Sequence, residues 1–185
     1  MLVGDVNYNP KGISFLKLIA EDFRTHEGEF LEPGFWAVAL HRFGNWRMGV
    51  RPKLLRAPFS LLYKFFYQAM CLCFGIALPY NTLLGRRVRI WHHGCIFIGA
   101  RSIGNDVHLR HNTTIGVLHR GEEGGKPVIG DRVDIGPGAV ILGPIEVGDD
   151  VTIGANSVVV RDVPSNSTVF GVPARPVRAF SRAKD

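Results

Sequence analysis

The chain of 185 residues is long enough for one domain, or for one domain with a modest appendage. With 46% hydrophobic and 21% charged residues it is not disordered throughout, and its 22 glycines are too many for a helical bundle. Its 22 lysine and arginine residues exceed its 16 aspartate and glutamate residues, and the net charge of +6 suits an anionic ligand or surface.

Cysteine usage and the first residues indicate the compartment. Cys71, Cys73 and Cys95 are an odd number of cysteines and lack the spacing of a disulfide framework, which is typical of a reducing cytoplasm. The opening residues MLVGDVNYNP contain no basic region followed by an apolar run, so we expect no secretory signal. The sequence therefore predicts a cytoplasmic protein.

Residues 1–80 are predicted to form an N-terminal helical region. Glycine is sparse there, and apolar residues recur at helical spacing in three runs, over residues 13–19, 35–48 and 59–76. We expect the third helix to begin only after Pro58, because proline disturbs the interior of a helix.

The third run, FSLLYKFFYQAMCLCFGIALP, is the most apolar part of the chain. A spanning helix needs roughly 20 apolar residues with few or no charges, whereas this run contains Lys64 and Gln68. We therefore expect a buried helix that packs on the second half of the chain. The alternatives are a true span and a helix lying on the inner face of the membrane; the latter is favoured by the preceding cations Arg51, Lys53 and Arg56.

From residue 84 onward the sequence repeats with a period of about six residues. An aliphatic residue leads every hexad, and the fifth place is small or aliphatic in nearly all of them. The twelve leaders are Leu84, Ile90, Ile96, Ile103, Leu109, Ile115, Ile129, Ile135, Ile141, Val147, Ile153 and Val159. A pattern of this length predicts a repeat architecture and makes a chance match negligible.

The repeat predicts a coiled parallel sheet. Each hexad is a short strand and a turn, three hexads complete a triangular coil, and stacked coils share backbone hydrogen bonds at about 4.8 Å spacing. The twelve hexads therefore give four coils. We place this β-helix at residues 81–165, with a C-terminal tail at 166–185.

The repeat also predicts which side chains lie above one another. His92 is expected in one column with His111, Pro137 and Ala155 on successive coils. The insertion at 117–128, VLHRGEEGGKPV, is polar, rich in glycine and too short to fold alone, so we expect it to project as a loop over a site or a neighbour.

Several blocks together resemble a known family. GRRVRIWHHGCIFIG, HNTTIG, GAVILGPIEVGDDVTIGANSVV and the closing GVPAR are similar to the serine acetyltransferase branch of the hexapeptide acyltransferases, and PGFWAVALHRFGNWRM resembles its N-terminal helices. The short N-terminus and the HRGEEGGKPVIGD loop resemble most the O-acetyltransferases found with exopolysaccharide synthesis. The resemblance implies a left-handed parallel β-helix, acetyl-CoA as co-substrate without a bound cofactor, and a homotrimer or a multiple of it.

The resemblance places the catalytic histidine at His92. Such a base takes the proton of an acceptor hydroxyl as its oxygen attacks the thioester, and then protonates the departing thiolate. His93 is expected as a neighbour. For orienting His92, the candidates are Asp22, Glu27, Glu29 and His111, and the sequence leaves the choice among them open.

Four positions depart from the serine-specific pattern. Ala77 and Trp91 stand where that branch carries acidic residues, and Gly125 and Lys126 stand where it carries Arg-His. A free serine has two charged groups that need partners when desolvated. We therefore expect a sugar hydroxyl of an exopolysaccharide precursor, stacked on Trp91, as the acceptor; the alternative is serine O-acetylation in cysteine biosynthesis.

The resemblance also implies a groove for acetyl-CoA between two subunits. Small residues of the later coils would line it, and arginines near the C-terminal coils would meet the phosphates. The residues expected there are Gly136, Gly138, Ala139, Gly154, Ala155, Arg161, Arg175 and Arg178.

Three other classes of protein are alternatives. A zinc lyase of the same fold would draw on His92, His108, His111 and His119, but His108 should point away from the others, so we expect no metal. A non-catalytic β-helix scaffold is the second class. Nucleic-acid binding is not expected, because the basic residues are scattered and no aromatic platform interleaves with them.

Overall fold

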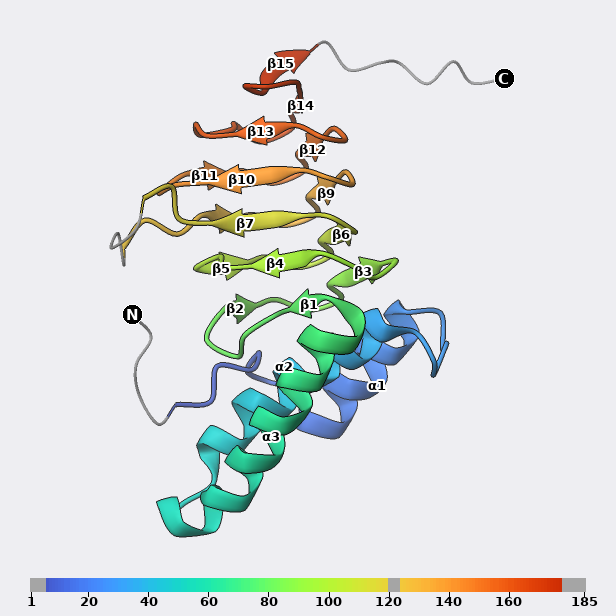
Figure 1. Ribbon diagram of the computed structural model, residues 1–185, viewed down its shortest axis with the longest axis vertical. Coiled ribbons are helices and arrows are strands. Elements are labelled where there is room, and N and C mark those ends of the chain that lie inside the picture. Colours follow the sequence, from blue (N-terminus) through green and yellow to red (C-terminus); the bar gives the residue numbers. More distant parts are fainter. Residues whose placement is uncertain (1–5, 120–123, 178–185) are drawn as a thin grey trace.

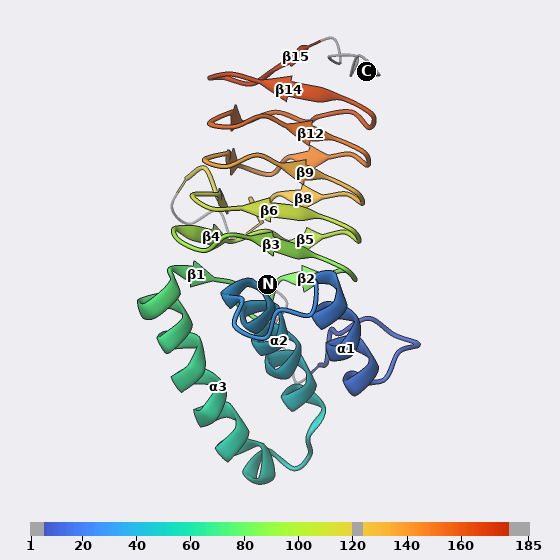
Figure 2. The same cartoon turned by 90° about the vertical axis from the view of Figure 1, so that its right-hand side faces the viewer.

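The computed structural model describes residues 6–119 and 124–177. Three helices lie at one end of a stack of β coils, and the chain rises through the stack coil by coil (Figure 1). A view turned by a quarter shows α1, α2 and α3 side by side beneath the first coil (Figure 2). The fold class expected from the sequence, a parallel β-helix with an N-terminal helical region, is confirmed.

The helical region contains α1 (Phe15–Thr25), α2 (Pro33–Trp46), the short 3₁₀ helix η1 (Arg47–Gly49) and α3 (Lys53–Phe74). The strands are β1 (Ile76–Ala77), β2 (Leu83–Leu84), β3 (Arg89–Trp91), β4 (Ile96–Ile98), β5 (Ser102–Ile103), β6 (His108–Arg110), β7 (Thr114–Gly116), β8 (Val128–Ile129), β9 (Asp134–Ile135), β10 (Val140–Leu142), β11 (Glu146–Val147), β12 (Thr152–Ile153), β13 (Val158–Val159), β14 (Thr168–Phe170) and β15 (Arg175–Val177).

The strands form the three faces of a prism. Sheet A has the order β1-β4-β7-β10-β13, sheet B the order β11-β8-β5-β2, and sheet C the order β15-β14-β12-β9-β6-β3. The expectation of four coils is wrong, because the stack has about five: β1 precedes the first predicted hexad, and β14 follows the last. Neither β1 nor β14 follows the six-residue spacing, so the repeat alone did not predict these two strands.

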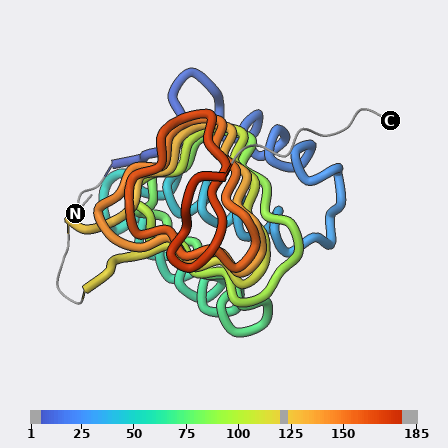
Figure 3. Tube along the Cα trace, turned by 90° about the horizontal axis from the view of Figure 1, so that it is seen from above, coloured from blue at the N-terminus to red at the C-terminus, as the bar shows by residue number. Residues whose placement is uncertain are grey.

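The core of the solenoid consists of the hexad leaders, which form one column on each of the three sheets. All twelve predicted leaders are buried, and so are Ile76 of β1, which extends the column of sheet A, and Val169 of β14, which extends the column of sheet C. Seen along the axis, the coils superimpose closely (Figure 3). No coil could bury this apolar face alone, so stacking is what removes it from water.

The end of the stack nearest the helices is closed by a buried ion pair. The guanidinium of Arg42, on α2, donates to both carboxylate oxygens of Asp22, on α1, at 2.9 and 3.4 Å. It also donates to the carbonyls of Leu84 and Gly85 at 2.9 and 2.6 Å. Both side chains of the pair are fully buried. Arg42 therefore supplies donors to backbone carbonyls that no further coil reaches.

Two more polar side chains of α2 donate hydrogen bonds to backbone carbonyls at the same end of the stack. His41 Nε2 donates to the Thr82 carbonyl at 2.9 Å, and Asn45 Nδ2 donates to the Tyr80 carbonyl at 2.8 Å. Because His41 donates through Nε2 to a carbonyl, its proton lies on that nitrogen. The helical region thus fixes the position of the first coil by hydrogen bonds to its backbone as well as by apolar packing.

The third helix differs from its prediction in extent and burial. It begins at Lys53 and contains Pro58, so proline did not mark its start. Of its side chains only Tyr63 and Met70 are buried, which corrects the expectation of a buried helix. Within the described part of the chain, no helix is both long enough and apolar enough to cross a membrane.

Beyond β13 the chain leaves the regular repeat. β14 continues sheet C in parallel on β12, whereas β15 runs antiparallel to β14, with Thr168 opposite Val177. The range 166–185, which we expected to be a tail, therefore contains two strands. Of the loop expected at 117–128 and of this last range, residues 120–123 and 178–185 lie outside the described residues.

Candidate active site

His92 lies at the corner where the chain passes from β3 in sheet C to β4 in sheet A. Its side chain is exposed, and its backbone is in the left-handed region, with φ of 56°. Ile90 pairs with Leu109 in register, so the two rings of His92 and His111 approach each other with centroids 5.9 Å apart. The predicted column of these two histidines is confirmed.

The two residues beside His92 have different surroundings. The ring of His93 lies edge-on to Phe74, at the end of α3, with centroids 5.9 Å apart. His111 Nδ1 is buried and has no hydrogen-bond partner among the described residues. His93 therefore packs toward the helical region, whereas His111 faces the site with one ring nitrogen unsatisfied.

Trp91 is not the open platform that a stacked sugar would need. The Arg89 guanidinium carbon lies 3.4 Å from the centre of its ring system, so one face of the indole is covered. Its Nε1 donates to His108 Nδ1 at 3.1 Å, and partial burial lowers the pKa of His108. The imidazole of His108 is thus an acceptor held by Trp91.

The N-terminal end of α2 presses against β3. A Cβ on Gly34 would collide with the Ile90 carbonyl oxygen, so only glycine permits this approach. His26 packs beside it: Nδ1 donates to the Asp22 carbonyl at 2.8 Å, and Nε2 accepts from the Ile90 amide at 3.3 Å. This pattern requires a neutral imidazole, in agreement with burial, which lowers the pKa of His26.

Two glutamates reach the site from the segment that joins α1 and α2. Glu27, expected as an orienting group, is bound instead by Arg89 Nη1 at 2.7 Å. Glu32, the residue before the first turn of α2, was missed; its Oε2 is buried without a hydrogen-bond partner among the described residues. Burial raises the pKa of Glu32, while the charges of Arg89 and His92 lower it, which places both within electrostatic range.

Of the other positions considered for the acceptor site, Lys126 lies at another corner of the protomer, whereas Ala77 lies on the strand beneath β4. Lys126 is half-buried at the end of the 117–128 insertion, which joins β7 of sheet A to β8 of sheet B. That corner differs from the corner of His92, between sheets C and A. Ala77 lies in β1, at the bottom of sheet A. Within one protomer, Lys126 and His92 therefore belong to different edges of the prism.

Several of the small residues expected to line the acetyl-CoA groove lie at the same corner of the prism as His92, on later coils. A Cβ on Gly136 would approach the Ala155 amide nitrogen to 2.6 Å, and one on Gly154 would collide with the Phe170 ring. Gly138 has φ of 72°, which a side chain would strain. Ala139 is fully buried inside the prism, so its side chain offers no surface to a ligand.

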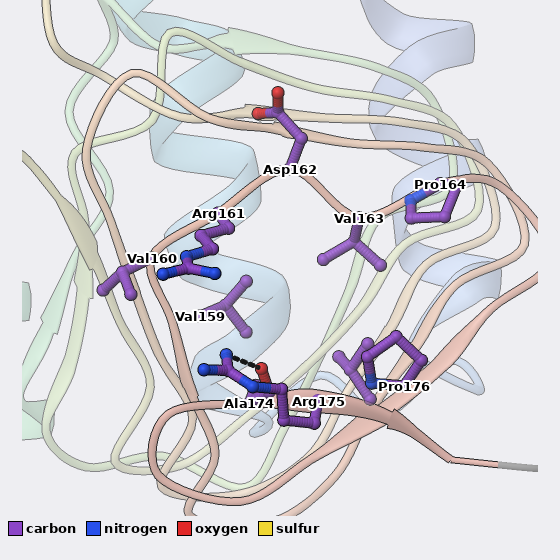
Figure 4. A pocket seen from close by; sticks show the side chains of 10 residues that line it. Val159, Val160, Arg161, Asp162, Val163, Pro164, Ala174, Arg175 and Pro176 are labelled. Atoms are coloured by element: carbon purple, nitrogen blue, oxygen red, sulfur yellow. Dashed lines mark hydrogen bonds between the residues drawn. The ribbon is translucent and has the colours of Figure 1, made fainter.

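The two arginines expected near the phosphates of CoA meet at the far end of the solenoid. Arg161 and Arg175 both line a cavity of about 160 Å³ between β13 and β15, with Asp162 at its rim (Figure 4). Arg178, also expected there, lies outside the described residues. Four strand spacings separate β3 from β14, or about 19 Å along the axis. Arg161 comes after β13 of sheet A and before Val163, which bridges Val147 of sheet B, so within one protomer it lies at the corner between sheets A and B and not at the corner of His92.

The histidines proposed for zinc do not form a ligand set. In the described ranges 6–119 and 124–177, no three His, Cys, Asp or Glu side chains lie together as a metal ion requires. His92 and His111 approach each other, His108 is bound to Trp91, and His119 lies in the insertion. The zinc lyase interpretation therefore has no geometric support in this part of the chain.

The hexads and the stacked parallel coils that they form define a hexapeptide-repeat solenoid, and His92 is exposed at one of its corners. The family profile described as "Bacterial transferase hexapeptide (six repeats)" matches residues 126–161. The Helicobacter pylori protein named serine acetyltransferase is 34% identical over 148 residues, which cover 80% of this chain and 82% of that protein. The chain belongs to the serine acetyltransferase family.

Other comparisons agree with this assignment. The serine acetyltransferase of Mycobacterium tuberculosis is 38% identical over 151 residues, covering 80% of this chain but 62% of that protein, so the chain spans about three fifths of its length. The Neisseria gonorrhoeae serine acetyltransferase in complex with serine superposes with a TM-score of 0.70 at 30% identity, covering 89% and 69%. The Brucella abortus enzyme in complex with coenzyme A gives 0.73 at 25%, covering 88% and 67%.

Proposed function

We propose that the protein transfers the acetyl group of acetyl-CoA to a hydroxyl, with His92 as general base. The observation that carries this proposal is the setting of His92: an exposed imidazole at a solenoid corner, beside the ring of His111 and within range of the Glu32 carboxylate. The names of the relatives, and the coenzyme A complex of one of them, support the donor.

The reaction needs one proton carrier. His92 takes the proton of the acceptor hydroxyl while the hydroxyl oxygen forms a bond to the thioester carbonyl carbon. The carbon–sulfur bond then breaks, and the imidazolium returns the proton to the CoA thiolate. Neither a redox partner nor a bound cofactor is required, and the products are an acetyl ester and free CoA.

L-serine is the acceptor that we propose. All the relatives named above are serine acetyltransferases, and one was solved with serine. The comparisons give no support to the exopolysaccharide branch that the sequence favoured. The sugar hydroxyl remains a second candidate only because Trp91 replaces an acidic residue, and the Arg89 guanidinium already covers one face of that indole.

We propose a homotrimer, or a multiple of it, as the active assembly. In one protomer the insertion that ends at Lys126 and the corner of His92 lie on different edges of the prism. A neighbouring prism packed side by side would bring the insertion of one copy to the His92 corner of the next. Light scattering that finds a stable, active monomer would contradict this arrangement.

We further propose that the protein works at the cytoplasmic face of the membrane, held there by α3. The outward stripe of α3 is apolar: Leu54, Leu61, Phe65 and Leu72 are 67–82% exposed and recur at helical spacing. No aspartate or glutamate occurs between residues 33 and 105. An apolar stripe within a purely cationic segment suits an anionic lipid surface better than a second copy of the same helix.

The test of the catalytic proposal is the thiol released from acetyl-CoA in the presence of L-serine. His92→Ala is expected to lower kcat by about 10²–10⁴-fold, the usual contribution of general-base catalysis, and to leave acetyl-CoA binding nearly unchanged. If His92→Ala retains wild-type turnover while His93→Ala or His111→Ala abolishes it, the assignment of the base is wrong.

A further inference from the structure

A cluster of unsatisfied polar atoms lies beside His92. Among the described residues, Glu32 Oε2, Arg89 Nε and His111 Nδ1 are buried and have no hydrogen-bond partner. Each such atom destabilises the fold if nothing ever binds it. Buried polar atoms without partners are rare in folded proteins, so three of them around one exposed base indicate a polar ligand.

The fold brings opposite charges to this place from distant parts of the sequence. Glu32 comes from the N-terminal end of α2, which is held against β3 by the contact of Gly34 with Ile90. Arg89 is the residue before Ile90 in β3, and its side chain leaves the solenoid on the outer side, because that of Ile90 points into the core. The Arg89 charge acts on Glu32, although no hydrogen bond joins them.

Arg89 is held in place before any ligand arrives. Its Nη1 donates to the exposed Glu27 at 2.7 Å, its guanidinium plane covers Trp91 at 3.4 Å, and its side chain is only 12% exposed. A guanidinium fixed on two sides, with Nε still unsatisfied, is preorganised for an anionic group. Trp91 thus takes a role different from a sugar platform: its indole supports Arg89.

We infer that Glu32 and Arg89 form the acceptor subsite for a zwitterionic hydroxy-amino acid. The Glu32 carboxylate binds the ammonium group, the Arg89 guanidinium binds the carboxylate, and the hydroxyl is left facing His92. This inference rests on the proposed function, since it assigns the acceptor of the same reaction. It also explains how the chain can bind serine although Ala77, Trp91, Gly125 and Lys126 replace the serine-specific pattern.

The experiment measures thiol release by the full chain with three acceptors: L-serine, 3-hydroxypropionate, which lacks the ammonium group, and ethanolamine, which lacks the carboxylate. The wild type is expected to prefer L-serine to both. Glu32→Gln should raise the KM for L-serine at least about 30-fold, the fold-change that corresponds to losing a buried charge partner, while the KM for acetyl-CoA stays unchanged. Its preference for L-serine over 3-hydroxypropionate should shrink accordingly.

Arg89→Gln should reduce the preference for L-serine over ethanolamine in the same way. Glu146→Gln, an exposed glutamate on sheet B, is the matched control and should leave every constant within about twofold of wild type. Equal KM values for L-serine in the wild type and in Glu32→Gln would overturn the subsite, as would a wild type that accepts ethanolamine as well as L-serine.

Calorimetric titration of L-serine separates the two proposals. If no acceptor supports thiol release, but L-serine binds to the wild type and at least about 30-fold more weakly to Glu32→Gln, the subsite stands and the acetyl-transfer proposal fails. If thiol release proceeds with sugars and L-serine does not bind, acetyl transfer stands and the subsite fails.

Discussion

Replacing Arg42 tests whether the helical region is held to the solenoid by polar contacts. Arg42→Met leaves the Asp22 carboxylate buried without a counter-charge and removes the donors to the Leu84 and Gly85 carbonyls. Removing one partner of a buried ion pair typically costs 3–5 kcal/mol. Each orphaned carbonyl adds about 1–3 kcal/mol if water cannot reach it. These contributions are not additive, and we expect a loss of about 4–6 kcal/mol, against typical total stabilities of 5–15 kcal/mol.

The assay is urea unfolding followed by far-UV circular dichroism. Arg132→Met is the matched control, because Arg132 makes a similar two-pronged pair with Asp150, at 2.7 and 2.6 Å, on the surface. Surface pairs contribute about 0–1 kcal/mol, so its midpoint should barely move. A second variant, Asp22→Leu with Arg42→Met, should recover part of the loss because no charge is then left buried. The reasoning is refuted if Arg42→Met unfolds within about 1 kcal/mol of wild type, or if the double variant is no more stable than the single one.

The remaining predictions concern pH and location. Burial lowers the pKa of His41 from 6.5 to about 3, so between these values the unfolded chain binds a proton that the native chain does not. Because of His41, the free energy of unfolding should therefore decrease as the pH falls through this window, by up to about 1.4 kcal/mol per pH unit. His41→Gln should make this dependence on pH weaker when the free energy is measured by urea unfolding at several pH values. An unchanged dependence would exclude His41 as its source. Wild-type protein should float with vesicles containing phosphatidylglycerol and not with pure phosphatidylcholine, whereas Leu61→Glu with Phe65→Glu should remain unbound; equal flotation of the double variant would rule out α3 as the attachment.

The solenoid could be predicted from the sequence because its information is local and repeated. Every predicted leader from Leu84 to Val159 is buried, and the column of His92 with His111 followed from counting alone. Counting hexads missed the strands at both ends of the stack, because Ile76 and Val169 do not follow the six-residue spacing of the predicted leaders. Their membership depends on what packs against them, which the repeat does not encode.

The acceptor subsite that we propose could not be predicted in the same way. Glu32 and Arg89 approach each other only because Gly34 lets α2 touch the edge of β3, a contact between segments with no shared pattern. Proline is common at the first position of a helix, so the pair Glu32-Pro33 indicated only where α2 begins. Trp91 was predicted to be a free ring because the sequence could not show that Arg89 would cover it.

The reversal of chain direction at β15 has a consequence for how copies of the protein behave toward each other. A parallel solenoid presents unpaired backbone at its last coil, which is a template on which a further coil, or another molecule, could add. β15 occupies sheet C there in antiparallel orientation, and Pro176 in its middle has no amide hydrogen to donate. The strand therefore ends longitudinal growth on that face, and we expect concentrated solutions to remain free of end-to-end fibrils.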